Sequence, residues 1–196
     1  DPSIAGDTDA YTLTFQHDAV GASNYLLTQI NSALSPSKIE LDQPSALRSE
    51  SNGADYILIA PSAFITSVQP LADFRINQGL RVAVTDVQDI YDEYNAGNVN
   101  PEAIREFLRY TYQNWVKPAP AHALLVGDGN YDPKDYYGYG EISYIPPYLA
   151  DVDPWMGETA ADNLYVCVSG EDQLPDMHLG RLLAKNIAGV EAMVGK

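Results

Sequence analysis

Residues 120–129 read PAHALLVGDG, in which the apolar run 123–126 leads directly into a Gly-Asp-Gly turn. An apolar run of about four to eight residues that is bounded by turn residues is typical of a strand buried on both faces of a parallel sheet. The stretch YILIA at 56–60 has the same character and is ended by a proline. Two such strands with helical patterns between them predict an α/β fold with a mostly parallel sheet.

A first helix is expected after the strand at 56–60. Pro70 suits the first turn of a helix, where its missing N–H needs no partner, and Gly79 suits the residue after a helix end. The apolar contacts of this helix are expected from Leu71, Phe74 and Ile76. Residues 80–85 then predict the next strand, which completes one strand–helix–strand unit.

A second helix is expected after an acidic loop at 86–94. Its start is well marked, because Asn100 can cap the first turn and Pro101 fits the first helical position. Apolar residues recur at helical spacing along it: Ile104, Phe107, Leu108, Tyr112 and Trp115. One covered face of this kind predicts a helix that packs on the sheet.

The flanking segments differ from this regular pattern. Residues 1–53 are rich in Ser, Asp, Asn and Pro and hold one alternating run at 11–15, which we interpret as the tail of a preceding β-rich module and a linker. Residues 129–160 predict a long aromatic loop, which is either functional or an excursion with short strands of its own. A strand at 177–182 and an amphipathic helix at the end of the chain complete a domain over 54–196 that we expect to be truncated.

Composition restricts the partners. The 196 residues carry 11 basic and 27 acidic side chains, a net charge of −16, which disfavours nucleic acid and anionic membranes. No segment approaches the roughly 20 apolar residues of a membrane span, and the first ten residues do not resemble a signal peptide. We therefore expect an interior excerpt or a processed form. The single cysteine cannot form an internal disulfide, so it leaves the redox compartment open.

Two acidic positions could carry chemistry. Asp128 follows a predicted parallel strand, which is where open α/β sheets place their ligands, although a tight turn in which the aspartate bonds its own backbone is as good an interpretation. The turn 171–176 holds three carboxylates and an amide, as calcium loops do, although a solvated surface turn is the commoner case. A calcium site becomes the better interpretation if Asp128 and the turn 171–176 lie close together in the fold.

Other chemical candidates favour structural roles. Cys167 lies inside an apolar run, where burial makes a thiol inert. The three histidines, His17, His122 and His178, stand next to or within predicted strands and lack the spacing of a zinc pair. Six tyrosines could line a sugar or peptide groove or simply pack on their own domain: Tyr131, Tyr136, Tyr137, Tyr139, Tyr144 and Tyr148.

An ordered set of motifs resembles the amino-terminal subdomain of the gingipain-type cysteine peptidases over residues 54–196. The motifs are Leu71-Ala72-Asp73-Phe74-Arg75, Gln78-Gly79-Leu80-Arg81-Val82, Leu124-Leu125-Val126-Gly127-Asp128, Ala161-Asp162-Asn163-Leu164-Tyr165 and Leu179-Gly180-Arg181-Leu182. The resemblance implies a caspase-like three-layer α/β/α fold. It also implies a secreted or cell-surface endopeptidase that cuts protein or peptide substrates with a Cys-His dyad.

The resemblance also implies which catalytic motifs are missing from this sequence. In the family the histidine lies in a Gly-His-Gly motif and the cysteine follows it, both in a second subdomain, and neither motif occurs here. No catalytic residue is therefore expected in this chain, which would contribute the structural half of the domain. The alternative is a non-catalytic binding or scaffold module at the cell surface that keeps the fold.

A structural calcium ion is the remaining expectation from the resemblance. The family's ligands correspond to the side chains of Asp128, Asp172 and Asp176 and to main-chain oxygens near Ser169 and Leu174. Asp176 replaces a glutamate of the family and is one methylene shorter. The resemblance thus predicts that one Ca²⁺ ties the end of the 123–126 strand to the turn at 170–176.

Overall fold

The structure is a computed structural model that describes residues 3–7, 10–16, 18, 21, 24, 41, 43–155, 157–170 and 172–196. The chain divides into two compact units, 1–42 and 43–196. In the first unit, β1 (Ser3–Asp7) pairs antiparallel with β2 (Ala10–Thr14). The sequence predicted the second of these strands to within one residue and missed the first.

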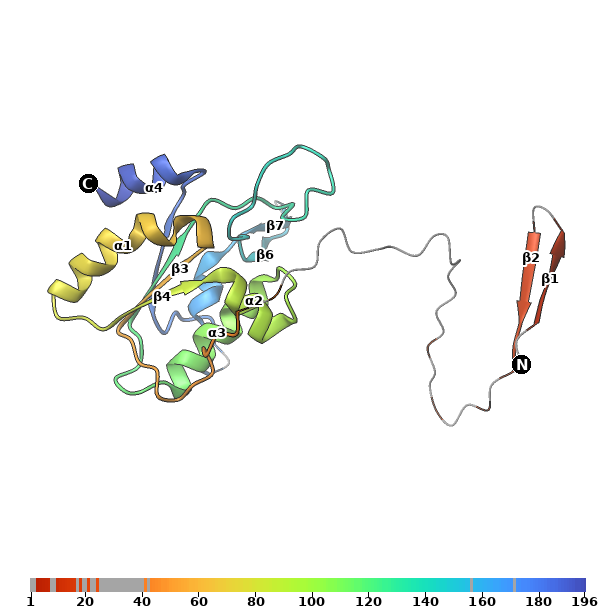
Figure 1. The fold of residues 1–196 in the computed structure, drawn as a ribbon, viewed down its shortest axis with the longest axis horizontal. Helices are drawn as coiled ribbons and strands as arrows, with labels where there is room; N and C mark the ends of the chain where they lie inside the picture. Colours follow the sequence, from red (N-terminus) through yellow and green to blue (C-terminus); the bar gives the residue numbers. More distant parts are fainter. Residues whose placement is uncertain are drawn as a thin grey trace. The chain divides into compact units, whose positions relative to one another are not determined.

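The second unit is built on a parallel sheet of four strands in the order β4-β3-β5-β8 (Figure 1). Its strands are β3 (Tyr56–Ala60), β4 (Val82–Asp86), β5 (His122–Val126) and β8 (His178–Leu182). Every neighbouring pair is parallel. The predicted α/β fold is therefore confirmed.

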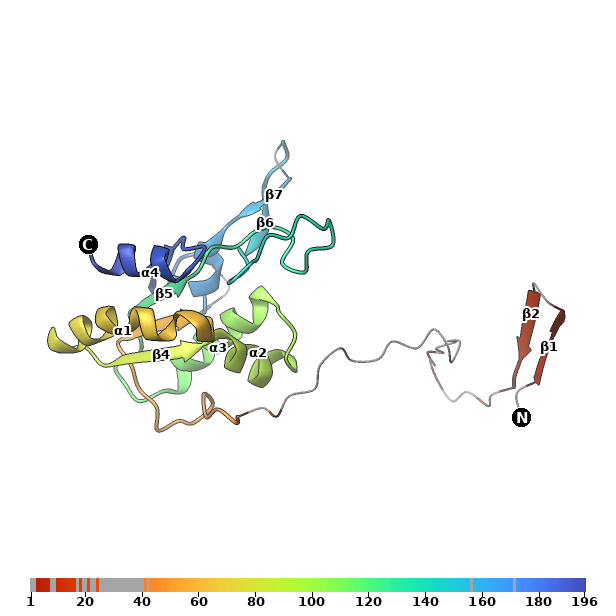
Figure 2. The same cartoon turned by 45° about the horizontal axis from the view of Figure 1, so that its top comes forward.

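Helices cover both faces of this sheet, as Figures 1 and 2 show. On one face lie α1 (Ser62–Asn77) and α4 (Ile187–Val194). On the other lie α2 (Val87–Asn95), α3 (Pro101–Asn114) and the short 3-10 helix η2 (Asp162–Val166). Because side chains alternate along a strand, each central strand supplies both cores and reads as a continuous apolar run. The result is a three-layer α/β/α unit.

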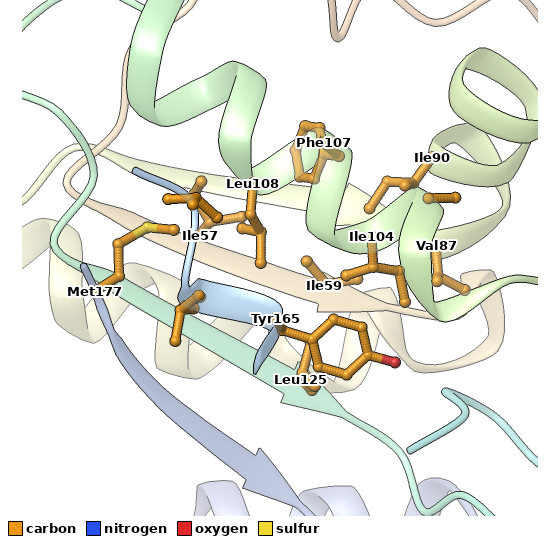
Figure 3. Close-up of a cluster of buried hydrophobic side chains, with 14 of the residues drawn as sticks. Ile57, Ile59, Val87, Ile90, Ile104, Phe107, Leu108, Leu125, Tyr165 and Met177 are labelled. Carbon is orange, nitrogen blue, oxygen red and sulfur yellow. The ribbon is translucent and has the colours of Figure 1, made fainter. Parts of the chain in front are cut away.

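The core on the α2 and α3 face is the larger of the two. Figure 3 shows Ile57, Ile59 and Leu125 of the sheet beneath Ile104, Phe107 and Leu108 of α3. Burying one side chain of this size contributes roughly 1.5–3 kcal/mol. This layer therefore fixes α3 on the sheet.

The first crossover helix corrects the predicted helix start. The helix begins at Ser62, directly after Pro61, so Pro70 lies in its interior and not in its first turn. Phe64, Val68 and Ala72 form its buried face, whereas Phe74 and Ile76 are 55% and 50% exposed. Burial of that face offsets an interior proline, which costs about 3 kcal/mol. The predicted end is confirmed, because Gly79 has a φ of +89° and its N–H bonds the carbonyl of Ile76.

The acidic stretch expected to be a loop is helix α2. Asp86 caps it, because its side chain accepts a hydrogen bond of 3.0 Å from the N–H of Gln88. Val87, Ile90 and Tyr91 are buried at helical spacing beneath the charged residues. The predicted start of α3 is confirmed, since the Asn100 side chain accepts from the N–H of Glu102 at 2.9 Å.

The predicted aromatic excursion leaves the sheet after β5. It contains an antiparallel pair, β6 (Leu149–Asp153) and β7 (Gly157–Ala160). Expected short strands are therefore present in this segment.

The compact unit begins at Gln43, whereas the regular sequence pattern begins at Ala54. Residues before Ala54 pack against helices: the indole N–H of Trp115 donates to the carbonyl of Leu47 at 3.0 Å, and Glu93 accepts the Leu47 N–H at 2.8 Å. In both of these hydrogen bonds Leu47 uses main-chain atoms, and bonds of that kind leave no side-chain pattern in the sequence.

An arginine clamps the amino edge of the sheet. The guanidinium of Arg81 lies 2.6 Å from the carboxylate of Asp55 and also donates to the carbonyls of Val116 and Pro118. It therefore joins the start of β3 to the segment that enters β5. Hydrogen bonding by the Arg81 side chain is the main reason that the pKa of Asp55 is lowered.

This clamp predicts a specific loss of stability in acid. A carboxyl whose pKa is lowered by folding stabilises the protein above its unfolded pKa of about 3.9 and loses that contribution as the pH falls through the folded pKa. Asp55→Asn should lower the urea midpoint at pH 7 and flatten its decline below pH 4. Asp73→Asn, on the exposed surface of α1, is the control. An unchanged acid slope in Asp55→Asn would refute the clamp.

Candidate functional site

The carboxyl edge of the sheet is the candidate site. From β3 the chain goes first to β4 on one side and later to β5 on the other, so the strand order reverses between β3 and β5. Open α/β sheets bind ligands at the carboxyl ends of the strands at such a switch point. Asp128 follows the end of β5 at this place.

Two glycines allow the chain to return across the end of β5. The N–H of Tyr144 donates to the carbonyl of Asp128 at 2.9 Å. A Cβ on Gly127, whose φ is +136°, would lie 2.6 Å from the Cβ of Tyr144, and one on Gly129 would lie 2.1 Å from the carbonyl oxygen of Ile145. No side chain fits at either position, so the Gly-Asp-Gly sequence is a packing requirement.

The carboxylate of Asp128 is engaged locally. One oxygen accepts from the N–H of Gly129 at 2.9 Å, and the other lies 3.6 Å from the ammonium of Lys185. The backbone-bonded turn that the sequence left open is therefore present.

Arg181 holds the carboxyl edge together, and sequence reasoning missed this role. Its side chain is 10% exposed and pairs with the carboxylate of Asp162 at 2.7 Å. It also donates to the carbonyls of Gly127, Ile145 and Pro146 at 2.8–3.2 Å. The sequence did hold a signal for this role, because Arg181 lies within a predicted strand and an arginine that is buried there requires several hydrogen-bond acceptors.

Two hollows open on this edge. One, of about 390 Å³, is lined by the start of α3 and by the excursion: Asn100, Pro101, Glu102, Asn130, Tyr131, Pro133, Pro146, Pro147, Tyr148 and Leu149. The Tyr148 hydroxyl donates to Glu102 at 2.7 Å, and burial followed by this hydrogen bond raises the pKa of Tyr148. The second hollow is lined by Asp128, Glu141, Tyr144 and Lys185 among others.

Three of the six tyrosines line these two hollows. Tyr131 and Tyr148 line the first hollow and Tyr144 the second. Tyr136, Tyr137 and Tyr139 are exposed.

The turn predicted to bind calcium is bonded to its own backbone. One carboxylate oxygen of Asp176 accepts from the N–H groups of Val168 and Ser169, both at 2.8 Å. The carboxylate of Asp172 accepts from the N–H of Leu174 at 3.0 Å. Glu171 lies outside the described residues.

The structure places Asp128 and this turn at opposite ends of the β5–β8 pair. In the parallel β5–β8 pair, His122 faces His178 and Val126 faces Leu182. Asp128 follows the carboxyl end of this pair, whereas Asp176 precedes its amino end. Six residues from Asp176 to Leu182, at about 3.3 Å each, separate the two ends by roughly 20 Å. Among the described residues, no three His, Cys, Asp or Glu side chains form a group that could hold a metal.

Cys167 has the environment of a structural thiol. It is buried, its thiol donates to the carbonyl of Asn163 at 3.3 Å, and burial raises its pKa. His122 and His178 instead stack on each other at the amino edge, with ring centroids 5.2 Å apart. His17 lies outside the described residues. Within the described part of the chain, no thiol and imidazole are paired for catalysis.

These features define the class of protein: a caspase-like α/β unit with its candidate site at the carboxyl edge of a parallel sheet. The sequence profile of Peptidase family C25 matches residues 49–196, so the chain belongs to this family.

Solved structures agree on the fold. One is described as "Crystal structure of dimeric latent PorU from Porphyromonas gingivalis", with a TM-score of 0.59 and 20% identity over 74% of this chain and 15% of that one. Another, "Structure of Protease", has a TM-score of 0.53 and 19% identity over 71% of this chain and 26% of that one. The chain thus spans a minor part of either protein. No curated protein matches it.

Replacing Arg181 should destabilise the unit strongly. Arg181→Met leaves the carboxylate of Asp162 without its cation and should lower the free energy of unfolding by about 3 kcal/mol. Arg109→Met breaks a surface pair with Glu106, one turn away on α3, and should cost less than about 1 kcal/mol. Urea unfolding of the full chain measures both. Equal losses would show that Arg181 is an ordinary surface arginine.

Proposed function

We propose that this chain is the structural half of a secreted gingipain-like cysteine endopeptidase, which acts on protein or peptide substrates outside the cell or at its surface. Membership of Peptidase family C25 supports a peptidase domain. In this proposal the catalytic cysteine and histidine come from a second subdomain; the buried position of Cys167, the only cysteine of the chain, and its hydrogen bond to the carbonyl of Asn163 support this. In the described residues, no helix is long and apolar enough to cross a membrane.

The observation that supports this proposal most directly is the unpaired edge strand β8. β8 bonds to β5 on one side, and no strand among the described residues pairs with its other side. An unpaired edge strand offers a row of N–H and C=O groups to another strand. A second subdomain that adds a strand there would place its own carboxyl-end loops beside Asp128 and the two hollows, where a peptide substrate could lie.

The chain by itself should therefore show no peptide hydrolysis, because nucleophilic catalysis needs a thiolate and a base within hydrogen-bond reach. In a longer protein that includes the second subdomain, a fluorogenic peptide should be cut, and Cys167→Ser should retain this activity. Replacing the downstream cysteine should abolish it. Turnover by the present chain that iodoacetamide blocks would contradict the proposal.

The alternative is a non-catalytic surface module with the same fold. The buried thiol fits this alternative equally well. Absence of hydrolysis in the longer protein, despite correct folding and a reduced downstream cysteine, would favour it.

Calcium binding is proposed only for the turn at 169–176. Asp172 is exposed and the structure shows one local backbone hydrogen bond to its carboxylate, which leaves oxygen lone pairs there and on the nearby carbonyls of Ser169 and Leu174. Asp128 belongs to the opposite edge and is not a ligand of this ion.

Millimolar Ca²⁺ should raise the melting temperature of the full chain, since a ligand that binds only the folded state stabilises it by mass action. Asp172→Ala should remove the shift, and Asp128→Asn should keep it. Mg²⁺ at the same concentration is the control for ionic strength. The absence of a shift in the wild type would remove the site, and a shift lost only in Asp128→Asn would move it to the other edge.

A further inference from the structure

A groove of about 630 Å³ lies between α1 and α4 and shares no lining residue with the two carboxyl-edge hollows. Figures 1 and 2 show the two helices on the same face of the sheet. The sheet supplies the floor and the helices supply the walls. Its lining residues are Tyr56, Pro70, Leu71, Phe74, Arg75, Leu124, Leu182, Met193, Val194, Gly195 and Lys196.

The walls expose apolar surface to solvent. Phe74 is 55% exposed and Met193 is 39% exposed, although both stand beside the buried core of this face. Apolar surface that lines a groove of this size marks an interaction site more often than scattered exposed residues do.

A row of rings continues the floor toward the amino edge. Tyr56 stacks on His122 with centroids 5.6 Å apart, and His122 stacks on His178 at 5.2 Å. The three residues begin neighbouring strands and are paired in register. They point to the α1 and α4 face, because they alternate with the residues of the other core. The two imidazoles therefore lie on the same face as the groove and continue from Tyr56, which lines it.

The charge of the groove is opposite to that of the protein. Arg75 and Lys196 line it, and no aspartate or glutamate is among its described lining residues. The chain as a whole has 27 acidic residues against 11 basic ones. Apart from Lys196, the last residue of the given sequence, the charged lining residue is Arg75, a cation that is complementary to a negatively charged partner group.

Arg75 has an unused donor. One of its terminal nitrogens donates to the side chain of Gln78 at 2.9 Å, and its guanidinium carbon lies 5.5 Å from the ring centroid of Tyr56. Its Nε is buried and has no hydrogen-bond partner. Because Arg75 lines the groove and a guanidinium carries five N–H groups, an acceptor that enters the groove can bond the N–H groups of its terminal nitrogens.

We propose that this groove binds an apolar peptide segment that presents a carboxylate side chain to Arg75. The apolar residues of the segment cover Phe74, Leu71 and Met193, and its carboxylate satisfies the guanidinium. This binding site is separate from the carboxyl edge and does not depend on the peptidase function.

Two blocked peptides test the proposal, Leu-Leu-Glu-Leu-Leu and its Gln counterpart, titrated into the full chain at constant pH. The chain has only three histidines, so proton NMR can follow the imidazoles of His122 and His178 while calorimetry gives the affinity. The Glu peptide should bind about tenfold more tightly than the Gln peptide, because a charge-assisted hydrogen bond is the stronger one. Binding should shift the signals of both imidazoles.

Matched variants separate charge from apolar contact. Arg75→Gln should bring the two peptides to equal affinity, and Phe74→Ala should weaken both. Arg48→Gln is the control, because Arg48 also lies over a tyrosine, Tyr94, but outside the groove. Thermal melting checks that each variant is folded, and Phe74→Ala, at an exposed position, keeps the test valid if Arg75→Gln unfolds.

Three outcomes would overturn the proposal. Equal affinities of the two peptides for the wild type would exclude carboxylate recognition. Binding without a shift of His122 and His178 would place the site elsewhere. Binding of decanoate but of neither peptide would assign the groove to a lipid carboxylate and not to a protein segment.

Discussion

The guanidinium of Arg181 lies within the carboxyl edge of the sheet, where a cation is stable only if its N–H groups find acceptors. It finds them in the carboxylate of Asp162 and in the carbonyls of Gly127, Ile145 and Pro146. These groups belong to four separate parts of the chain: η2, the end of β5, the returning excursion and, through Arg181 itself, β8. One side chain therefore holds these four parts of the chain together at the candidate site.

The two glycines follow from this arrangement. Once the carbonyls of Ile145 and Pro146 are held by Arg181, the excursion crosses the end of β5 so closely that Gly127 and Gly129 cannot carry a Cβ. At the opposite edge, the pair of Arg81 and Asp55 performs a similar task for the start of β3. The apolar core of the unit thus lies between two edges that are each held by an arginine.

Local signals predicted the elements whose boundaries are set by neighbouring residues. The strands β3 and β5 and the start of α3 at Asn100 and Pro101 were found because apolar runs, caps and first-turn prolines act within a few residues. Pro70 and α2 were misjudged for the complementary reason. In α1, burial of Phe64, Val68 and Ala72 against the sheet offsets the cost of the interior proline. In α2, burial of Val87, Ile90 and Tyr91 stabilises a helix in a stretch whose acidic composition is typical of a loop.

The sequence by itself determined the layered α/β class and the family, because these depend on residue type and order along the chain. It also placed Asp128 at the end of a strand. Only the tertiary structure decided that Asp128 and the turn at 169–176 occupy opposite ends of the β5–β8 pair, since this depends on the direction and register of strands that are distant in sequence. The partner of Arg181 was decided in the same way, because packing chooses which carboxylate meets a buried cation.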